Sequence, residues 1–596
     1  MKVHPMFADV RFEPPGPGPW ELEKSHFSRP ATRFGADALK EGMPIGFAKG
    51  MERYGLPMKG ISLVMVNGFA YGQMQPLGVP AGVASLGSGP PPKPLLWLLF
   101  RVHPEIRARF KRCERAFESK LWRTDLGHWD RVDKPRAIEK HLALQAIDPA
   151  SLDLGALREH LKRTRTHMAE MITLHHHYNF TVMLPTGDYI AHVREWTGVS
   201  SGEALALLRG TSPLARGIAI DELEALAKAL RASEEGRGVL TRQGDAQAAL
   251  DALVALPGEV GTAARAYLDL VRCRSIGYDI SDKTAGELPD MLVRAIRATV
   301  EENRADDALA TRDAKEREIR ARVPAAHRAH FDELLGEARR VNRLRDERGI
   351  YADSWGTGLA RRAVLEVGRR LVSAGKIEDP EHAVDLTIEE MVALLEGRSG
   401  PSAAELSKRA LYRATMTLEH APPWLNAPPG EPPPLDVFPA AARRAMKAMN
   451  MLMEDMTADH ANAGKPPEPE SKNAAARVQG LTINAGVYEG TARVVLDPAD
   501  FGRIQKGDVL VTRSTSAYFN VVLPLLGAIV TDRGGQLSHA AIVAREYGIP
   551  GIVGTKAATV TIPDGARVRV DGETGEVTIL AAAPSPSPAL APEVAL

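Results

Sequence analysis

Cysteine is almost absent from this chain of 596 residues, which contains only Cys113 and Cys273. The two residues form neither a Cys-x-x-Cys pair nor a mixed Cys/His metal spacing, so the sequence predicts no zinc motif and no disulfide framework. Such cysteine usage is typical of a reducing compartment. We therefore expect a cytoplasmic protein.

An excess of charge of either sign is also absent, because Lys+Arg and Asp+Glu both number 75. This balance gives no electrostatic reason to expect nucleic acid or an anionic membrane as a partner. Long apolar runs are missing too. The aliphatic run Pro94–Phe100 is far shorter than the ~20 residues that span a bilayer, and residues 1–18 contain no apolar signal-peptide core. We expect no membrane partner.

The first two-thirds of the chain predict one large, mainly helical unit. Residues 1–100 are rich in Gly and Pro, and Asn67-Gly68 between Ile61–Met65 and Phe69–Tyr71 predicts two strands around a tight turn. In residues 101–463, apolar side chains recur with helical period. Clear examples of this periodicity are residues 157–173, 220–232 and 359–373.

The last part of the chain has a different composition. Residues 464–477 are rich in Pro and polar residues and predict an extended linker of roughly 3 Å per residue. Residues 478–581 alternate short β-branched runs with Gly, Asp and Pro around one helix, Ser538–Tyr547, whereas the Ala/Pro/Ser tail 582–596 is expected to be disordered. The predicted fold class is multidomain: a large mainly α-helical domain followed by a C-terminal α/β domain.

The stretch from Thr531 to Pro550 carries the clearest chemical signal. Gly534-Gly535 predicts a tight turn that leaves room for a bulky group, and Ser538 is a good helix N-cap. His539 then falls in the first helical turn, where free N–H groups and the helix dipole stabilise a phosphoryl group. A neutral imidazole is a competent nucleophile that can form a phosphoramidate and pass the group on. The alternative is a histidine that merely lies at a helix start.

The segment Gly-Gly-x-x-Ser-His-Ala-Ala-Ile-Val-Ala-Arg-Glu-x-Gly-Ile-Pro resembles the signature of the swivelling phosphohistidine domain of PEP-utilising enzymes. That domain occurs in phosphoenolpyruvate synthase, pyruvate phosphate dikinase and rifampicin phosphotransferase, and the resemblance extends over about residues 481–580. It implies that His539 is the phosphorylated residue. The supporting loop and helix residues that it implies are Gly534, Gly535, Ser538 and Arg545.

One segment departs from the family pattern. Relatives commonly carry an Asp-Pro-x-Trp-like stretch after the strand equivalent to residues 509–512, where this chain has Ser514–Asn520. The difference concerns how the domain docks at its partner sites, not the phosphohistidine.

The resemblance also implies further functional sites whose motifs this chain does not show. Enzymes of this family combine an ATP-grasp domain, the swivelling histidine and an acceptor site, and the first 480 residues contain no ATP-grasp signature. We therefore expect ATP and Mg²⁺ to be handled by a separate ATP-grasp subunit. Phosphoenolpyruvate stays open as an alternative donor.

The helical region has a weaker resemblance to the acceptor-binding part of rifampicin phosphotransferase and to the histidine-bearing subunit of phenylphosphate synthase, which is itself split from its ATP-binding subunit. Residues 1–463 are thus expected to bind a small hydroxylated acceptor. The segments that carry this resemblance are Asn67–Tyr71, Arg274–Asp279, Glu287–Pro289, Arg339, Arg345–Arg348, Leu365–Leu371 and Gly375–Ile377.

Three histidines are candidates for deprotonating the acceptor. On one helix His160, His167 and His175 would fall within roughly 80° of one another, whereas the consecutive histidines 175–177 cannot all face one ligand. Packing histidines are the alternative. No metal is predicted, since neither a carboxylate nor a cysteine completes a ligand set.

Arg345 and Arg348 are candidates for holding the transferred phosphate, because guanidinium groups match phosphate oxygens. The alternative is a solvated, charged helix face.

The sequence thus favours a dikinase-type phosphotransferase subunit. Two other functions stay open: a dehydratase that phosphorylates its substrate in order to eliminate phosphate, and a non-catalytic docking or regulatory protein.

Overall fold

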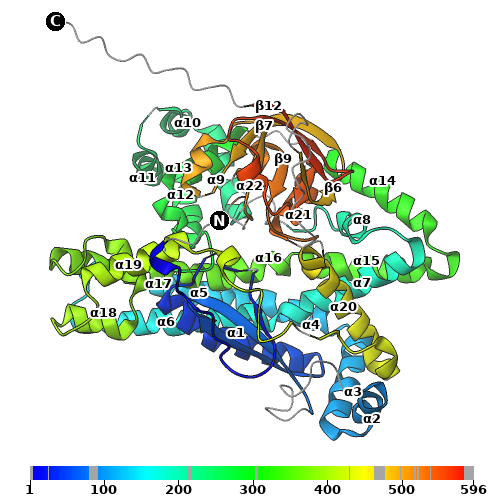
Figure 1. The fold of residues 1–596 in the computed structure, drawn as a ribbon. Coiled ribbons are helices and arrows are strands. Elements are labelled where there is room, and N and C mark those ends of the chain that lie inside the picture. Colours follow the sequence, from blue (N-terminus) through cyan, green and yellow to red (C-terminus); the bar gives the residue numbers. More distant parts are fainter. Residues whose placement is uncertain are drawn as a thin grey trace, which may run out of the picture.

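The computed structural model describes residues 5–24, 26–27, 29–78, 92–212, 218–242, 244–301, 307–428, 430–461, 477–496, 498–515, 519, 522–536 and 538–582. The predicted linker 464–477 lies outside these residues except for Arg477, and the predicted tail 582–596 lies outside them except for Ala582. Within the described residues a helical region carries an α/β domain on one side (Figure 1).

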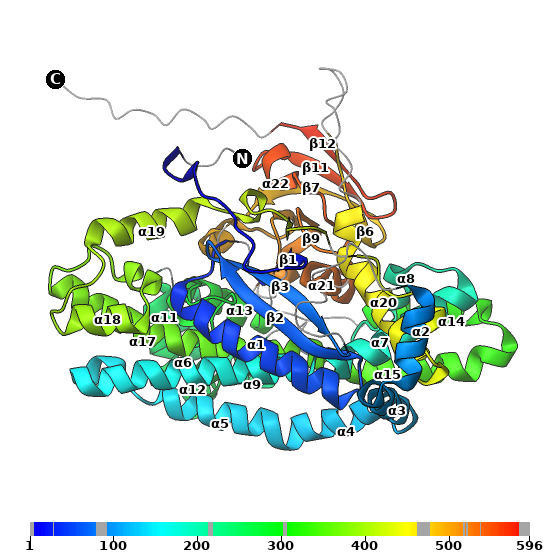
Figure 2. The same cartoon turned by 60° about the horizontal axis from the view of Figure 1, so that its bottom comes forward.

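A small antiparallel sheet and a long helix open the chain. The sheet has the order β2-β3-β1-β4. Asn67 and Gly68 both have positive φ, 51° and 79°, which gives the tight two-residue turn between β2 and β3 that the sequence predicts. Figure 2 shows α1 lying along β2 and β3. The bounds of these elements are α1 (Arg33–Arg53), β1 (Trp20–Leu22), β2 (Met58–Val66), β3 (Phe69–Pro76) and β4 (Trp424–Leu425).

Helices make up most of the following region, as its periodicity predicts. The three segments singled out in the sequence are α6, α9 and α17. The helices between β3 and the α/β domain are α2 (Lys93–Val102), α3 (Pro104–Glu118), α4 (Leu121–His128), α5 (Lys134–Gln145), α6 (Leu154–His177), α7 (Asn179–Thr197), α8 (Ser201–Ala206), α9 (Ile220–Ala232), α10 (Glu234–Thr241), α11 (Ala246–Ala255), α12 (Gly258–Val271), α13 (Pro289–Glu301), α14 (Asp307–Arg322), α15 (Arg328–Asn342), α16 (Leu344–Arg348), α17 (Ser354–Ser373), α18 (Ile388–Leu395), α19 (Ala403–Thr415) and α20 (Ala440–Ala461).

The centre of the helical region is α6, which packs between α1 and α17. Its apolar positions Leu157, Leu161 and Ile172 are buried in one cluster with residues of both neighbours. This packing fixes the end of α6, where three consecutive histidines lie. A π-helical segment, Gly349–Asp353, interrupts the path from α16 to α17 beside that end. Such segments are frequent at functional sites.

The C-terminal domain is built on one mixed sheet, which confirms the predicted α/β class. The strand order is β5-β12-β11-β7-β8-β9-β10-β6, with β7, β8, β9 and β10 paired in parallel. The elements of this domain are β5 (Arg477–Gln479), β6 (Leu481–Asn484), β7 (Val487–Val494), β8 (Asp508–Thr512), β9 (Leu526–Thr531), β10 (Gly551–Val553), β11 (Arg567–Asp571), β12 (Glu576–Ala581), α21 (His539–Tyr547) and α22 (Ala558–Thr561).

The α/β domain docks on the helical region through apolar and polar contacts. Buried apolar side chains of α9, α12 and α13 form one continuous cluster with residues of the α/β domain, including Phe501 and Phe519. Polar contacts add to this, because Arg294 donates to the Gly502 carbonyl at 2.8 Å and Arg209 Nε donates to the Glu546 carbonyl at 2.9 Å. The docked position brings the start of α21 towards α16.

Across the described residues, every helix is either too short or too polar to cross a bilayer.

Candidate functional site

His539 lies at the first turn of α21, as the sequence predicts. Ser538 caps the helix, its side chain accepting the Ala541 N–H at 3.3 Å. The imidazole Nδ1 lies 3.0 Å from the hydroxyl oxygen of Thr515, in the loop that follows β8. When Nδ1–H donates to this hydroxyl, the Nε2 lone pair is free to attack an electrophile.

The glycines before Ser538 shape the loop. Gly534 has φ +114°, and a Cβ at this position would lie 2.8 Å from the Ser538 hydroxyl. The Gly535 carbonyl accepts the Ser538 N–H at 3.0 Å. Gly534 is therefore required by the local backbone, a reason distinct from the space for phosphate that the sequence suggests.

Arg545, two turns further along α21, holds the loop in place. Its guanidinium donates to the Ile483 carbonyl on β6 at 2.9 Å and to the Gln536 carbonyl at 2.6 Å. The side chain is buried by these contacts. Arg545 thus positions the segment before His539 by tying it to β6.

A cation of the helical region lies close to His539. Burial, and then the charge of Arg345 on α16, lowers the pKa of His539 to about 3. Although part of the residue remains exposed, the ring is neutral at pH 7. The neutral imidazole of His539 thus lies within electrostatic range of a guanidinium across the boundary between the two regions.

The other charged side chains of α16 have different surroundings. Glu347 is buried and accepts from Trp129 Nε1 at 2.9 Å and Lys134 Nζ at 3.3 Å, so it anchors the helix. Arg348 donates to the His175 carbonyl at 3.2 Å. Burial, followed by the neighbouring charge of Arg345, lowers the pKa of Arg348 to about 10. Arg345 and Arg348 thus form a pair of adjacent cations.

A cluster of histidines lies beside Arg348. His175 Nδ1 is 3.0 Å from Asp353 Oδ2 in the π-helical segment. Burial lowers the pKa of both His175 and His176, and the charge of Arg348 lowers them further. His26, from the loop after β1, joins them, so that one potential ligand atom of each of the three histidines lies within 4.8 Å of the others.

His26 has well-defined partners of its own. Its Nδ1 lies 3.0 Å from Glu23 Oε1, and its ring packs edge-on against Tyr278 with centroids 4.8 Å apart. Burial lowers the pKa of His26, but the Glu23 carboxylate outweighs this and the pKa ends above its ordinary value. Aromatic, acidic and basic groups thus converge next to the two arginines.

The predicted grouping of His160, His167 and His175 is not found. His167 Nε2 contacts His141 Nδ1 at 2.9 Å, and the charges nearest to His160 are Arg163 and Arg362. Although the three share a helix face, the rise of 1.5 Å per residue separates His160 and His167 from His175 by about 22 and 12 Å. A common angle on the helix does not bring them to one small ligand.

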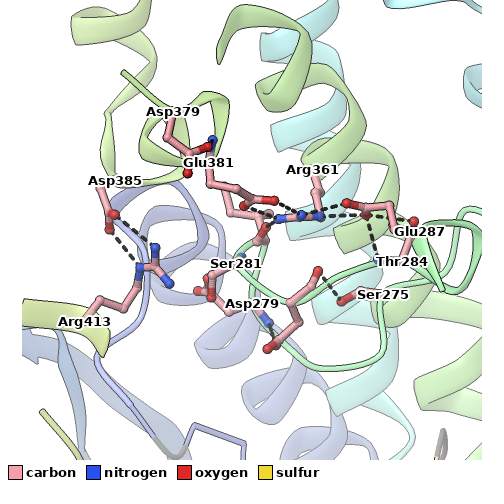
Figure 3. A network of polar contacts seen from close by, with 12 residues as sticks. Ser275, Asp279, Ser281, Thr284, Glu287, Arg361, Asp379, Glu381, Asp385 and Arg413 are labelled. Atoms are coloured by element: carbon pink, nitrogen blue, oxygen red, sulfur yellow. Dashed lines mark hydrogen bonds and ion pairs between the residues drawn. The ribbon is translucent and has the colours of Figure 1, made fainter. Parts of the chain in front are cut away.

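A buried ion-pair network holds the loop that carries Tyr278 (Figure 3). Arg361 on α17 is completely buried and pairs with Glu287 at 2.7 Å, contacts Glu381 at 3.0 Å and donates to the Ile280 carbonyl at 3.0 Å. Asp279 in turn accepts the N–H and hydroxyl of Thr32 at the start of α1. The network joins α1 and α17 through this loop.

Five site residues are not identified by sequence reasoning: Glu23, His26, Tyr278, Asp353 and Thr515. Tyr278 and Thr515 lie in segments that the sequence marks, the first by resemblance and the second by departure from the family pattern. Nothing in the sequence distinguishes His26, because its neighbours in the site come from distant parts of the chain.

Two family models match parts of the chain. Residues 504–575 match the mobile domain of PEP-utilising enzymes, and residues 177–346 match the rifampicin phosphotransferase fourth domain. These matches confirm the resemblance carried by the Ser538-His539 motif and the weaker resemblance of the helical region to rifampicin phosphotransferase. The resemblance to phenylphosphate synthase stays a prediction.

Three curated relatives match parts of the chain. The uncharacterised phosphotransferase YvkC of Bacillus subtilis is 30% identical over 254 residues, 42% of this chain and 27% of that protein. A rifampicin phosphotransferase of Streptomyces sviceus is 30% identical over 345 residues, 56% of this chain and 36% of that protein. Chondramide synthase cmdD of Chondromyces crocatus is 27% identical over 517 residues, 80% of this chain and 12% of that protein. The chain thus spans between 12% and 36% of the length of these relatives.

Among solved structures, holo-form aconitase X of Thermococcus kodakaraensis aligns with 18% of this chain and 98% of its own at 22% identity and a TM-score of 0.15. A likeness of this size supports no function.

Proposed function

Because residues 504–575 match the mobile domain of PEP-utilising enzymes, we propose that His539 accepts a phosphoryl group on Nε2 and passes it to a hydroxyl of a small organic acceptor. One observation carries this proposal: the His539 imidazole is neutral, is held through Nδ1 by Thr515, and is within electrostatic range of Arg345 of the helical region. A nucleophile and a candidate phosphate-binding cation therefore lie at the same interface.

In the first step the Nε2 lone pair attacks the phosphorus of the donor, and the donor leaves with the electron pair of its broken O–P bond. We propose ATP as the donor, held with Mg²⁺ by a separate ATP-grasp subunit. The ion neutralises phosphate charge in such transfers. The dipole of α21 and its free N–H groups stabilise the phosphoryl group once it is on the ring.

In the second step the acceptor oxygen attacks the same phosphorus and the Nε2–P bond breaks. Its electron pair returns to Nε2, and the hydroxyl proton passes to a base on the acceptor side. Because Nδ1–H stays bound to Thr515, the leaving group is a neutral imidazole rather than an anion. Arg345 and Arg348 offset the charge that builds up on the phosphoryl oxygens.

The docked arrangement fits the second step, since His539 faces the helical region. Reaching a donor on another polypeptide requires the α/β domain to leave this position and break contacts such as Arg209 to Glu546 and Arg294 to Gly502. We propose that residues 464–477 serve as the linker for this motion. Closure at either end would exclude water and protect the phosphohistidine from hydrolysis.

We propose the cytoplasm as the site of this reaction. ATP is available there, and Cys113 and Cys273, both buried without a disulfide, would remain reduced.

The test is phosphoryl labelling of the full chain. The protein is incubated with a candidate ATP-grasp partner, Mg²⁺ and ATP labelled at either the β or the γ position. We expect acid-labile label on residue 539, none in His539→Gln, and full labelling of the matched control His167→Gln. Label that persists in His539→Gln would contradict the proposal. Phosphate release without a phosphorylated product would identify the dehydratase alternative.

A further inference from the structure

The histidines at the end of α6 form a second possible centre, apart from His539. We propose that His26, His175 and His176 bind a divalent transition-metal ion of the Zn²⁺ class, with a fourth position open to the acceptor. Ion binding stands on the geometry of these residues alone, whereas its role in phosphoryl transfer rests on the proposed function.

The distances suit three imidazole ligands. Their potential ligand atoms lie within 4.8 Å of one another, and the ring centroids are 4.7 Å apart for His175 and His176 and 5.7 Å for His26 and His176. Ligand nitrogens on one tetrahedral Zn²⁺ at 2.0–2.1 Å lie about 3.4 Å apart. His26 lies on a loop, so a small side-chain rotation would close the difference.

A carboxylate lies near Nδ1 of two of the three rings, and we assign Nε2 of these rings as the ligand atom. His26 Nδ1 shares a hydrogen bond of 3.0 Å with Glu23 Oε1, whereas His175 Nδ1 lies 3.0 Å from Asp353 Oδ2 without hydrogen-bond geometry. Carboxylates that hold the far nitrogen of a ligand histidine are a general feature of metal sites, because they fix the tautomer and strengthen the ligand.

His176 is held in a different way. Its Nδ1 lies 3.3 Å from the side-chain amide of Asn179, and its ring stacks on Phe47 with centroids 5.0 Å apart. The structure places the Asn179 Nδ2 atom at this contact and leaves the buried Oδ1 without a hydrogen-bond partner. Turning the amide by 180° would bring Oδ1 to the ring, so that His176 Nδ1 carries the proton and Nε2 keeps its lone pair. The ring is thus fixed in orientation before an ion arrives.

The charges around the cluster allow a dication. Arg348 opposes it, and its charge acts on all three histidines. Two carboxylates, Glu23 and Asp353, offset this opposition.

The position of the ion would allow it to activate the acceptor hydroxyl. Arg348 donates to the His175 carbonyl at 3.2 Å and lies on the same short helix as Arg345, whose charge acts on His539. An acceptor hydroxyl bound to the open position of the ion would have a lowered pKa, as metal-bound water does, and would lose its proton to the base on the acceptor side. The resulting oxygen attacks the phosphorus, while the electron pair of the broken N–P bond returns to Nε2.

The test uses Co²⁺ alone as a spectroscopic probe of the full chain. We expect one Co²⁺ per chain with the visible absorption of a four-coordinate site, displaced by Zn²⁺. His26→Ala should weaken binding at least 100-fold, and Glu23→Gln, which keeps all three ligands, about 10- to 100-fold. The matched control His177→Ala should bind as wild type, since its ring neighbours Tyr178 rather than this cluster.

A wild-type protein without the Co²⁺ spectrum, or affinity that Glu23→Gln and His26→Ala leave unchanged, would overturn the proposal. Labelling of His539 is measured in the same variants. If the label is absent while Co²⁺ binds, the proposed function fails and the metal site stands. If His539 is labelled and Co²⁺ does not bind, the proposed function stands and the histidines act without a metal.

Discussion

The two regions of this molecule build their parts of the site in different ways. In the α/β domain, one continuous stretch supplies the turn, the helix cap and His539. In the helical region, the site residues come from three separate stretches of the chain, around His26, Tyr278 and Arg345–Asp353. They meet only because α1, α6, α17 and the π-helical segment pack together. The first part of the site is set by neighbouring residues of one segment, and the second part depends on how the helices pack.

The largest effect on stability is expected from disrupting the packing of the helical region. Arg361→Met removes the buried cation between Glu287 and Glu381 and leaves their carboxylates uncompensated. We expect the free energy of unfolding to fall by about 3 kcal/mol in chemical denaturation. The control Arg362→Met, at a half-exposed neighbour, should cost less than about 1 kcal/mol. An equal loss of unfolding free energy in the two variants would show that the ion-pair network does not stabilise the helical region.

Arg345→Gln tests the meeting point of the two regions. We expect phosphoryl transfer to an acceptor to fall about 10²- to 10³-fold, because a charged donor to the phosphoryl oxygens is lost. Labelling of His539 by the donor subunit should persist. The pKa of His539, followed by NMR, should rise towards its ordinary value without the Arg345 charge, although burial is the larger cause of its depression.

The control for this variant is Arg340→Gln, at an exposed position near the end of α15. It should leave both transfer and the pKa of His539 unchanged. A similar loss of transfer in both variants would argue against a specific role for Arg345.

A smaller effect on rate is expected from the contact that orients the His539 ring. Thr515→Val removes the hydroxyl partner of Nδ1, and we expect phosphorylation of His539 to slow roughly 3- to 10-fold, the usual contribution of one hydrogen bond. Thr515→Ser, which keeps a hydroxyl, should restore most of the rate in the same rapid-quench assay. If valine and serine behave alike, the contact at 3.0 Å does not orient the ring.

The smallest effect concerns the docking of one region on the other. Burial, with a smaller contribution from Asp346, raises the pKa of Glu546 to about 7. Since docking favours the protonated carboxyl, its contribution is complete below the ordinary pKa of about 4.5 and is lost as the pH rises through 7. We expect the docked fraction, measured by single-molecule energy transfer, to fall about two- to fivefold between pH 6.5 and 8.

Glu546→Gln should abolish this pH dependence, because an amide stays neutral throughout. The control Glu573→Gln, at an exposed turn of the same domain, should retain it. A docked fraction of the wild-type protein that is constant over this range would contradict the role of Glu546.

The α/β domain shows how far local sequence reaches. The strands at residues 508–512 and 567–570 and the helix from Ser538 follow from β-branched runs and a capping serine, and the structure has them within a residue or two. The role of Gly534 was only half anticipated, since its positive φ is visible only in the folded loop.

The helical region shows where sequence reasoning stops. Helical period identified α6, α9 and α17, but angular position alone grouped His160 and His167 with His175. The expectation of no metal rested on the lack of a carboxylate or cysteine to complete a ligand set, and it did not consider His26, which is 149 residues before His175 in the chain. Its approach depends on how the loop after β1 packs against the end of α6.

The sequence by itself determined the elements and the nucleophile, because helix period, strand alternation and the turn before His539 are short-range properties of neighbouring residues. Only the tertiary structure decided what faces that nucleophile. Which side chain meets which across hundreds of residues depends on the packing of whole helices, and no local pattern records that packing.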